Sequence, residues 1–321
     1  MAEFKITANS KNGFKLSSEF RNFPVTFVNS LRRIMLHGVP TVAIRDVQIL
    51  GNTTQMPHEM LKHRMELLPV NVLPDDAGAI RDAVIELRIH PDPTTDRMVT
   101  TDDFVVEAGR NHILMKDRDL DTPLLFLRVR KNETVHMRGR LAIDTDVASQ
   151  VCTATMFYHL DEELVKQKRE EHIATGEDVR VFDNFLVQRH YSRDEMGRPN
   201  WINLDVESVG VMSSKKIVSS ATAILKQRMD AWLDEANEKI GREPEPNSYR
   251  ITLESGGHTV GSIIQEIIYH SDMASFVSYD VPHPLRSTLV IRIFSDKKPE
   301  DILKKVRSDI HEYCAIVEKE V

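Results

Sequence analysis

The chain has 321 residues, 41% hydrophobic and 28% charged, and this ordinary globular composition at this length suggests two or three domains. It has no apolar run of roughly 18 residues and no basic-then-apolar leader, so we expect a soluble intracellular protein. The net charge of −7 disfavours nucleic-acid binding as the main task, and the two cysteines, Cys152 and Cys314, exclude a disulfide framework or a cysteine-rich metal site.

The first elements in chain order are a hairpin and a short helix. Apolar residues alternate along residues 4–8 and 14–16, on either side of Asn12 and Gly13, which is typical of a hairpin. Pro24 then opens a helix that Gly38 and Pro40 end. Its apolar residues recur at helical spacing and predict one buried face: Phe27, Val28, Leu31, Ile34 and Met35. Arg32 and Arg33, about 100° apart on the helix, point to different surroundings.

The middle of the chain is rich in short strands. After a strand at 42–49 and a helix at 58–68, apolar segments at 84–89, 104–106, 113–115, 124–129, 135–143 and 153–160 predict strands. Their connections are rich in Asp, Thr, Gly and Pro, which indicates a β-rich lobe inserted into another domain. The charged run 161–171 predicts a solvated helix face or loop, and 180–191 a short helix.

A long helix begins at Ser213 or Ser214 and extends to about Ile240. Its apolar stripe exceeds seven turns, more than its own domain can cover, so we expect a partner helix. Residues 241–247 read as a Pro-stiffened linker. A second unit follows, with strands at 249–253, 276–281 and 289–294, a helix at 259–270 and a long final helix, and its element order echoes the first unit.

Several segments carry a resemblance to known polymerase subunits. The segments NSLRRIML, GVPTVAI, NTT and HEMLKHRMELLPV within residues 29–70, and NLDVESVG at 203–210, resemble the third-largest subunit of multisubunit RNA polymerases, the relative of the bacterial alpha subunit. The segments GHTVGSIIQEIIYH at 257–270 and VSYDVPHPL at 277–285 resemble the eleventh subunit of the nuclear enzyme, which is its separate partner. The inserted lobe matches only by position, and the cysteine cluster of many relatives is absent.

The resemblance implies an α+β fold in which both halves of an alpha-like heterodimer are fused. The dimerisation domain would comprise 1–71 and 200–242, the β-rich insertion 72–199, the linker 243–247 and the eleventh-subunit-like domain 248–321. It implies a non-catalytic assembly platform, without cofactor or metal, that docks the two largest polymerase subunits and small zinc-binding assembly subunits. We expect little DNA contact, no membrane and no homodimer. Such fusions occur in large nucleocytoplasmic DNA viruses, which implies a virion and cytoplasmic viral-factory location.

The resemblance and the helical periodicity also imply two sets of site residues. For the interface between the two halves within the chain, the expected residues are Phe27, Leu31, Ile34, Met35, Ile217, Ile224, Trp232, Val260, Ile263, Ile267, Ile302, Val306, Ile310 and Tyr313. For docking of the large subunits, family position suggests Arg32, Arg33, Asn52, Thr53, Thr54, His58, Lys62, His63, Arg64, Glu207 and Ser208.

Three stretches imitate catalytic motifs. His58 and His63 are five residues apart, so on a helix they diverge by about 140° and cannot chelate one zinc. The 256–262 loop has P-loop-like glycines without the phosphate-binding lysine, and we expect its glycines to turn the chain, Thr259 or His258 to cap the helix and Gly261 to admit a close neighbour. Four aspartates near residues 92–103 read as turn and cap residues. A stand-alone metal- or nucleotide-dependent enzyme, or a scaffold of another complex, stays as the alternative.

Overall fold

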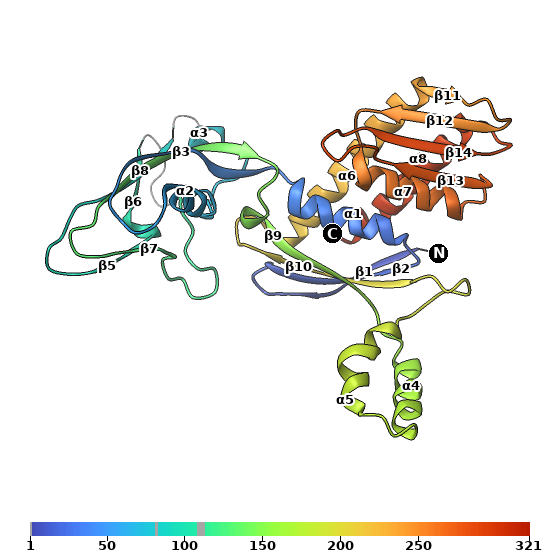
Figure 1. Ribbon diagram of the computed structural model, residues 1–321, viewed down its shortest axis with the longest axis horizontal. Helices are drawn as coiled ribbons and strands as arrows, with labels where there is room; N and C mark the ends of the chain where they lie inside the picture. The colour runs from blue at the N-terminus through green and yellow to red at the C-terminus, as the bar shows by residue number, and fades with distance from the viewer. Residues whose placement is uncertain (1, 81–82, 108–112) are drawn as a thin grey trace.

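The computed structural model of the protein describes residues 2–80, 83–107 and 113–321. Two α/β units lie side by side, a β-rich lobe extends from the first unit, and a helical protrusion projects from the same unit (Figure 1). Residue 1, and residues 81–82 and 108–112 of the expected β-rich insertion, lie outside the described residues.

The first unit is a four-stranded antiparallel sheet covered by two helices. Its elements are β1 (Glu3–Asn9), β2 (Lys15–Arg21), α1 (Val25–His37), β9 (Cys152–Tyr158), β10 (Trp201–Ser208) and α6 (Ser214–Glu238). The strands lie in the order β1-β2-β10-β9, with Leu204 opposite Ser18 on one side and Met156 on the other. The strands alternate buried and exposed residues, so one face packs against the helices while the other faces solvent.

The second unit repeats this arrangement. Its elements are β11 (Ile240–Arg242), β12 (Ser248–Leu253), α7 (Gly257–His270), β13 (Phe276–Asp280), β14 (Leu289–Phe294) and α8 (Pro299–Glu320). The strand order β11-β12-β14-β13 matches that of the first unit strand for strand, and α7 and α8 take the places of α1 and α6. The echo expected from the sequence is therefore a repeated topology within one chain.

The β-rich lobe sits where the second unit has only the short connection between α7 and β13. It contains β3 (Thr41–Asn52), α2 (His58–Glu66), α3 (Ala77–Ile80), β4 (Val84–Ile89), β5 (Arg97–Thr100), β6 (Phe104–Glu107), β7 (Leu125–Val129) and β8 (Val135–Asp144), with 3-10 turns at Thr101–Asp103 and Ala148–Gln150. One sheet has the order β3-β8-β4-β6, and β5 pairs with β7. Together with α2 these strands enclose their own hydrophobic core.

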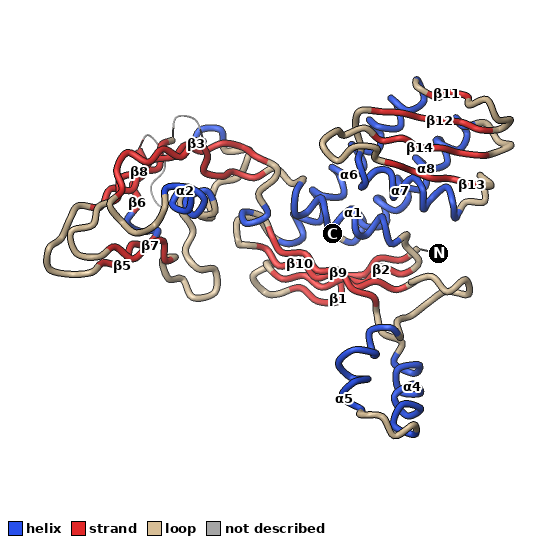
Figure 2. The backbone as a smooth tube through the Cα atoms, in the orientation of Figure 1, coloured by secondary structure: helices blue, strands red, loops and turns tan. Residues whose placement is uncertain are grey.

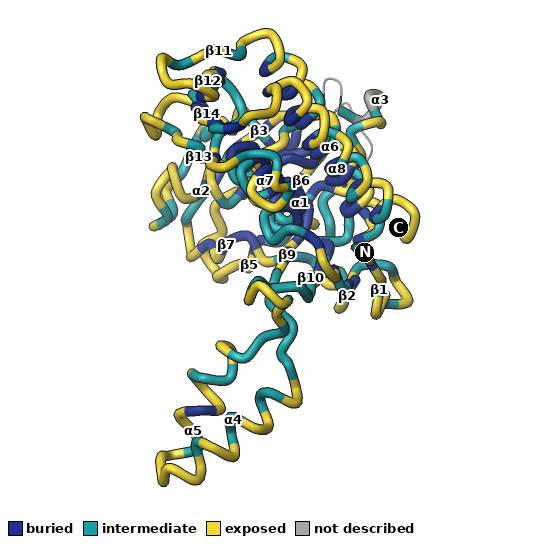
Figure 3. The backbone as a smooth tube through the Cα atoms, turned by 90° about the vertical axis from the view of Figure 1, so that its right-hand side faces the viewer, coloured by how far each residue is buried: buried dark blue, intermediate teal, exposed yellow. Residues whose placement is uncertain are grey.

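The helical protrusion sits where the second unit has only the turn between β13 and β14. Helix α4 (Glu162–Ala174) packs against α5 (Val179–Val181) and the π turn Phe182–Leu186, which a 3-10 turn, Val187–Arg189, follows (Figure 2). Bridges between Leu160 and Tyr191 and between Arg193 and Pro199 close its base. Every residue of α4 is exposed or half-buried (Figure 3), which agrees with the solvated helix expected from its charges.

The α+β class with two alpha-like units is confirmed, but strand pairing moves the expected boundaries. Strand β3 and helix α2, expected in the dimerisation domain 1–71, belong to the lobe, because β3 pairs with β8 and α2 packs into the lobe's core. Strand β9, expected in the insertion 72–199, pairs with β10 and completes the first sheet. Strand β11, expected at the end of the first domain and the start of the linker, pairs with β12. A change in local amino-acid composition along the chain does not reveal which strand completes which sheet.

Smaller expectations also changed. The chain forms an additional strand, β5, between the expected ones, and residues 113–115 contribute only a single bridge, from Leu114 to Val70. Pro24 occupies the N-cap position of α1 and not the expected first helical position, so the helix begins one residue later, at Val25. The long helices α6 and α8 and the strands of the second unit lie within a few residues of their expected bounds.

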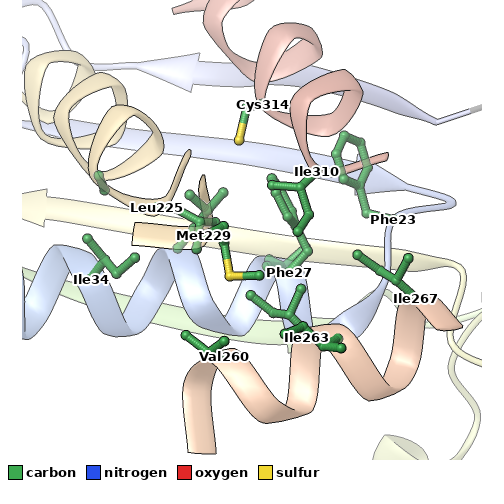
Figure 4. Packing of buried hydrophobic residues seen from close by; sticks show 14 of the residues in the cluster. Phe23, Phe27, Ile34, Leu225, Met229, Val260, Ile263, Ile267, Ile310 and Cys314 are labelled. Atoms are coloured by element: carbon green, nitrogen blue, oxygen red, sulfur yellow. The ribbon is translucent and has the colours of Figure 1, made fainter. Parts of the chain in front are cut away.

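One hydrophobic core spans both units. Buried residues of α1, α6, α7 and α8 belong to the same cluster as the inner faces of both sheets. Figure 4 shows Phe27, Met229, Ile263 and Ile310, one from each of the four helices, converging in this core. The two units therefore share an interior, whereas the lobe has a separate one.

Candidate assembly interface

The short helix α1 lies at the centre of the shared core. Its sequence gives it apolar residues on more than one side, and Phe27, Leu31 and Met35 are completely buried. The helix contacts strand β9 of its own sheet, the long helix α6 and helix α7 of the other unit. A helix covered on several sides can hold its neighbours in one arrangement, because each neighbour must fit a different strip of its surface.

Helices α1 and α7 cross in opposite directions and exchange polar contacts at both ends of the crossing. The carboxylate of Glu266 in α7 accepts hydrogen bonds from the backbone amides of Val25, at 3.2 Å, and Thr26, at 2.9 Å, and from the Thr26 hydroxyl. At the other end, the Arg33 guanidinium of α1 donates to the Thr259 hydroxyl of α7 at 3.1 Å. Glu266 therefore caps the first turn of a helix more than 200 residues away in the chain.

The long helices α6 and α8 also run antiparallel. Arg307 of α8 contacts the Asp234 carboxylate of α6, and one turn further along His311 lies 2.8 Å from Asp230. Lys215, near the start of α6, lies 3.5 Å from the C-terminal Val321 carbonyl oxygen. These polar contacts flank a stripe of buried residues, so the partner helix that the sequence required for α6 is α8.

Two glycines of the second unit are required by close packing. Gly256 has a φ of +100°, and a Cβ there would lie 2.8 Å from the Trp232 indole nitrogen of α6. The Trp232 N–H donates to the Ser255 carbonyl at 3.3 Å. A Cβ on Gly261 would lie 2.5 Å from the Tyr279 ring, which confirms that this glycine admits a close neighbour. The expected cap by Thr259 or His258 is wrong, since Gly256 occupies the N-cap position of α7.

An aromatic cluster marks the junction of α1 and α8. The Tyr313 ring lies 5.2 Å from Phe23 and 5.4 Å from Phe27, and burial raises the pKa of its hydroxyl. Nearby, Arg198 lies 2.6 Å from Nδ1 of His270 in α7, and burial together with the Arg198 charge lowers the pKa of His270. A neutral imidazole suits this contact, because its Nδ1 can then accept a hydrogen bond from the guanidinium N–H.

The structure brings the expected interface residues together. Twelve of the fourteen are buried in the shared core, namely Phe27, Leu31, Ile34, Met35, Ile217, Trp232, Val260, Ile263, Ile267, Ile302, Val306 and Ile310. The other two, Ile224 and Tyr313, are half-buried and pack against it.

The expected docking residues are distributed over separate places. Asn52 and Thr54 form a tight turn after β3, where the Asn52 side chain accepts from the Thr54 amide at 2.9 Å, and the Thr53 amide donates to the Thr134 carbonyl. His58, Lys62 and His63 are exposed on α2. Figure 1 places α2 in the lobe, away from α1. The eleven residues therefore do not form one surface.

Several of these residues are engaged within the chain. Arg32 donates to the Ala154 carbonyl at 3.0 Å, and Arg64 donates to the Phe126 carbonyl at 2.9 Å. Glu207 pairs with Arg118 at 2.6 Å and with Lys15 at 3.2 Å, and these partners hold the pKa of Glu207 below its usual range. The Ser208 side chain cannot meet a partner, because the residue is only 1% exposed and its hydroxyl donates to the Met212 carbonyl.

The segments that resemble catalytic motifs make packing contacts and hydrogen bonds within the chain. The side of the 256–262 loop formed by Gly256 packs against Trp232, where a phosphate cradle would need open space. Asp92 accepts from Thr94 and Thr95 within its own turn, and the Thr94 bonds are the main reason that its pKa is lowered to about 2. Over residues 2–80, 83–107 and 113–321, no three His, Cys, Asp or Glu side chains are grouped as metal ligands.

The polar contacts between the units were missed by sequence reasoning. Glu266, Asp230, Arg307 and His311 look like ordinary charged residues on helix surfaces, and their partners are far away in sequence. One signal was available for Glu266. A threonine precedes it by seven residues, as Thr26 precedes Arg33 in α1, so the two helices carry matching polar positions.

Comparison with known proteins agrees with this architecture. Residues 18–229 match the family model described as the RNA polymerase Rpb3/Rpb11 dimerisation domain, and residues 248–320 match a second model with the same description. The first match runs from within β2 to within α6 and includes the lobe and the protrusion, and the second covers the second unit from β12 to α8. No helix in the described part of the chain is both long and apolar enough to span a membrane.

Curated relatives carry consistent descriptions. The chain is 28% identical over 174 residues to "DNA-directed RNA polymerase subunit Rpo3" of Pyrobaculum calidifontis, covering 51% of this chain and 66% of that protein. It is 25% identical over 276 residues to "DNA-directed RNA polymerases II, IV and V subunit 3" of Arabidopsis thaliana, covering 66% and 85%. It is 26% identical over 247 residues to the Rpo3 subunit of Natronomonas pharaonis, covering 73% and 98%. The chain thus spans slightly less than two thirds of the first relative and most of the other two.

Proposed function

This chain belongs to the RNA polymerase Rpb3/Rpb11 dimerisation-domain family, and from that premise we propose that it is the non-catalytic assembly platform of a DNA-directed RNA polymerase. One observation supports this role above all others: two units of the same topology share a single hydrophobic core within one chain. An assembly platform needs a fixed shape rather than reactive groups. In this proposal the catalysis belongs to the two largest subunits.

The proposal includes a fusion of the two partners. The second unit, which begins at β11 and includes residues 248–321, takes the role of the eleventh subunit, and the first unit that of the third subunit. The repeated strand order and the two antiparallel helix pairs support this assignment. Residues 243–247, expected as the linker, form the turn between β11 and β12, so the direct connection from α6 to β11 joins the two units. This short connection would hold the units at an effective concentration of millimolar order, so pairing would not depend on protein concentration and no homodimer would be needed. Such a fusion supports a viral origin, with the protein in virions and cytoplasmic viral factories.

Docking of the two largest subunits and of small zinc-binding subunits is proposed at surfaces outside the shared core. The leading candidate is the exposed surface of α2, formed by the side chains of His58, Lys62 and His63. Thr53, which is also exposed, lies five residues before the start of this helix. Arg32, Arg64 and Glu207 would act mainly by holding the lobe and strands in place, because each already binds a group within the chain.

Purification of the tagged full chain from cells or particles that contain it tests the function. We expect two retained subunits well above 100 kDa in mass spectrometry, and an eluate that makes RNA from a DNA template. Elution alone or with unrelated proteins would contradict the polymerase role. Stoichiometric zinc by elemental analysis, or micromolar nucleotide affinity, would instead support the stand-alone enzyme.

A pair of charge variants tests the docking surface. The change Lys62→Glu with His63→Glu alters exposed residues of α2, and we expect the large subunits to be lost while the chain remains folded. The matched control is Lys166→Glu with Lys168→Glu on α4, which changes charges on the protrusion. Retention of both large subunits by the α2 variant would show that docking occurs elsewhere.

A further inference from the structure

The polar contacts between α1 and α7 follow the internal repeat of the chain. In α1, Thr26 precedes Arg33 by seven residues, and in α7, Thr259 precedes Glu266 by seven residues. Seven residues is close to two turns, so each pair lies on one face of its helix. In the structure Arg33 reaches Thr259 and Glu266 reaches Thr26, so the equivalent positions of the two helices contact each other reciprocally.

The two reciprocal contacts differ in charge, because one is made by the Arg33 guanidinium and the other by the Glu266 carboxylate. The first helical residues of α1 are Val25, Thr26 and Phe27, and its N-cap residue is Pro24, so α1 supplies neither a capping side chain nor an acidic group to its own positive end. Glu266 supplies both from the other unit, and its side chain is only 19% exposed. Charge-assisted bonds to backbone amides at such a position are among the stronger hydrogen bonds in proteins.

The alternative pairing of two first units would lack this cap. By the same geometry, Arg33 of one copy would face Thr26 of the other, which brings a guanidinium to the uncapped positive end of α1. The amides of Val25 and Thr26 would lose their acceptor at both ends of the pair. Mixed pairing of a first with a second unit avoids both penalties.

We propose that Glu266 is the specificity-determining residue of unit pairing: it recognises the uncapped start of α1, while Arg33 at the equivalent position disfavours pairing between two first units. This inference deepens the proposed function, because it rests on unit pairing as the basis of the platform. It assigns the choice of partner to one charged position in each helix, whereas the apolar core supplies the bulk of the contact area.

The test uses the full chain with a protease site inserted into residues 243–247, the exposed turn between β11 and β12, and cleaved after purification. Strand β11 then stays on the first piece, and its pairing with β12 is common to every variant. Native mass spectrometry then follows the separation of the two pieces. For Glu266→Gln we expect about tenfold faster dissociation, the size of effect typical of a lost charged hydrogen bond. For Arg33→Glu we expect dissociation no faster than in the unchanged chain, because the new carboxylate would face the start of α7. A simple loss of the Arg33–Thr259 bond would give the opposite result.

A double variant in which the two charged residues are exchanged tests the proposal more directly. Glu266→Arg alone should dissociate faster still, and Arg33→Glu with Glu266→Arg should recover at least tenfold of that loss, since it again leaves one capped helix per pair. Glu170→Arg, an exposed charge reversal on α4, is the matched control and should dissociate at the unchanged rate. Unchanged dissociation of Glu266→Gln, or a double variant no slower than Glu266→Arg, would overturn the proposal.

Hydrogen exchange on the uncleaved chain provides a readout that does not depend on the pieces staying folded. Glu266→Gln should speed exchange of the amides of Val25 and Thr26, while β4 in the lobe remains unaffected. Unchanged exchange at these amides would contradict the cap. Both measurements use the isolated chain, so failure of co-purification with large subunits would overturn the proposed function and leave this result standing.

Discussion

His311 of α8 lies 2.8 Å from the Asp230 carboxylate of α6, and this contact joins residues 81 positions apart. It lies beside the buried stripe of the two long helices. Both side chains are more than a third exposed, so solvent screens the interaction.

Asp230→Ala should lower the free energy of unfolding by about 1 kcal/mol or less, because partly exposed ion pairs contribute little. Urea unfolding of the full chain measures the difference. Glu238→Ala, at an exposed position of the same helix, is the control. A loss of several kcal/mol would mean that the Asp230 contacts, rather than the apolar stripe, hold α6 and α8 together.

Leu31→Asp should prevent stable folding of the paired units. Leu31 is completely buried in the shared core, and a carboxylate there has no partner, which costs roughly 4 kcal/mol or more. Leu31→Met keeps the volume and should cost less than about 1.5 kcal/mol. Circular dichroism and size-exclusion chromatography distinguish the two, and a monomeric, fully folded Leu31→Asp chain would contradict the shared-core packing.

Arg118→Ala should loosen the lobe from the first unit. The Arg118 guanidinium donates to the Ser208 carbonyl and to Glu207 of β10, and its side chain is largely buried. We expect a loss of about 1 kcal/mol at pH 7, reduced from the value for a buried pair because the Glu207 side chain is 44% exposed. Arg180→Ala, whose side chain is exposed on the protrusion, should change nothing measurable.

The pH dependence of the Arg118 effect follows from the carboxyl groups that it contacts. Arg118 holds the pKa values of Glu207 and Asp119 below their usual range. A lowered folded pKa stabilises the protein above the unfolded pKa, and this contribution is lost as the pH falls through the folded value. The difference between unchanged and variant chains should therefore shrink from about pH 5 downwards, leaving the part due to the Ser208 carbonyl. A constant difference from pH 7 to pH 3 would exclude the ionic part.

Removal of residues 161–190, with an Asn-Gly turn joining Leu160 to Tyr191, should leave the rest of the fold intact. These two residues already form an antiparallel bridge, which a tight turn can close. The buried ring of Phe182 packs against His172 and His190, all within the removed segment. We expect the melting temperature to change by no more than about 4 °C in calorimetry. Failure to fold would show that the protrusion contributes to the core of the first unit.

Much of the secondary structure followed from the chain alone. The spacing of Phe27, Leu31 and Ile34 predicts the buried face of α1, and the long stripe of α6 predicts that another helix must cover it. Periodicity is a local property, so it can be read wherever one face of an element is buried. The apolar half of the candidate site was accessible for the same reason.

Tertiary structure alone decided which distant elements meet. Strand β3 is the first strand of the lobe and β9 follows the lobe in the chain, and only their pairing with β8 and β10 shows to which sheet each belongs. No local sequence feature of Glu266 predicts Thr26 as its partner. A hydrogen bond between residues 240 positions apart depends on how the two helices cross. The sequence by itself determined most of the elements, the buried faces of the helices and the need for a second unit. Strand pairing determined the sheet boundaries and the crossing of the helices determined the polar contacts, since both arise only when separate elements are brought together.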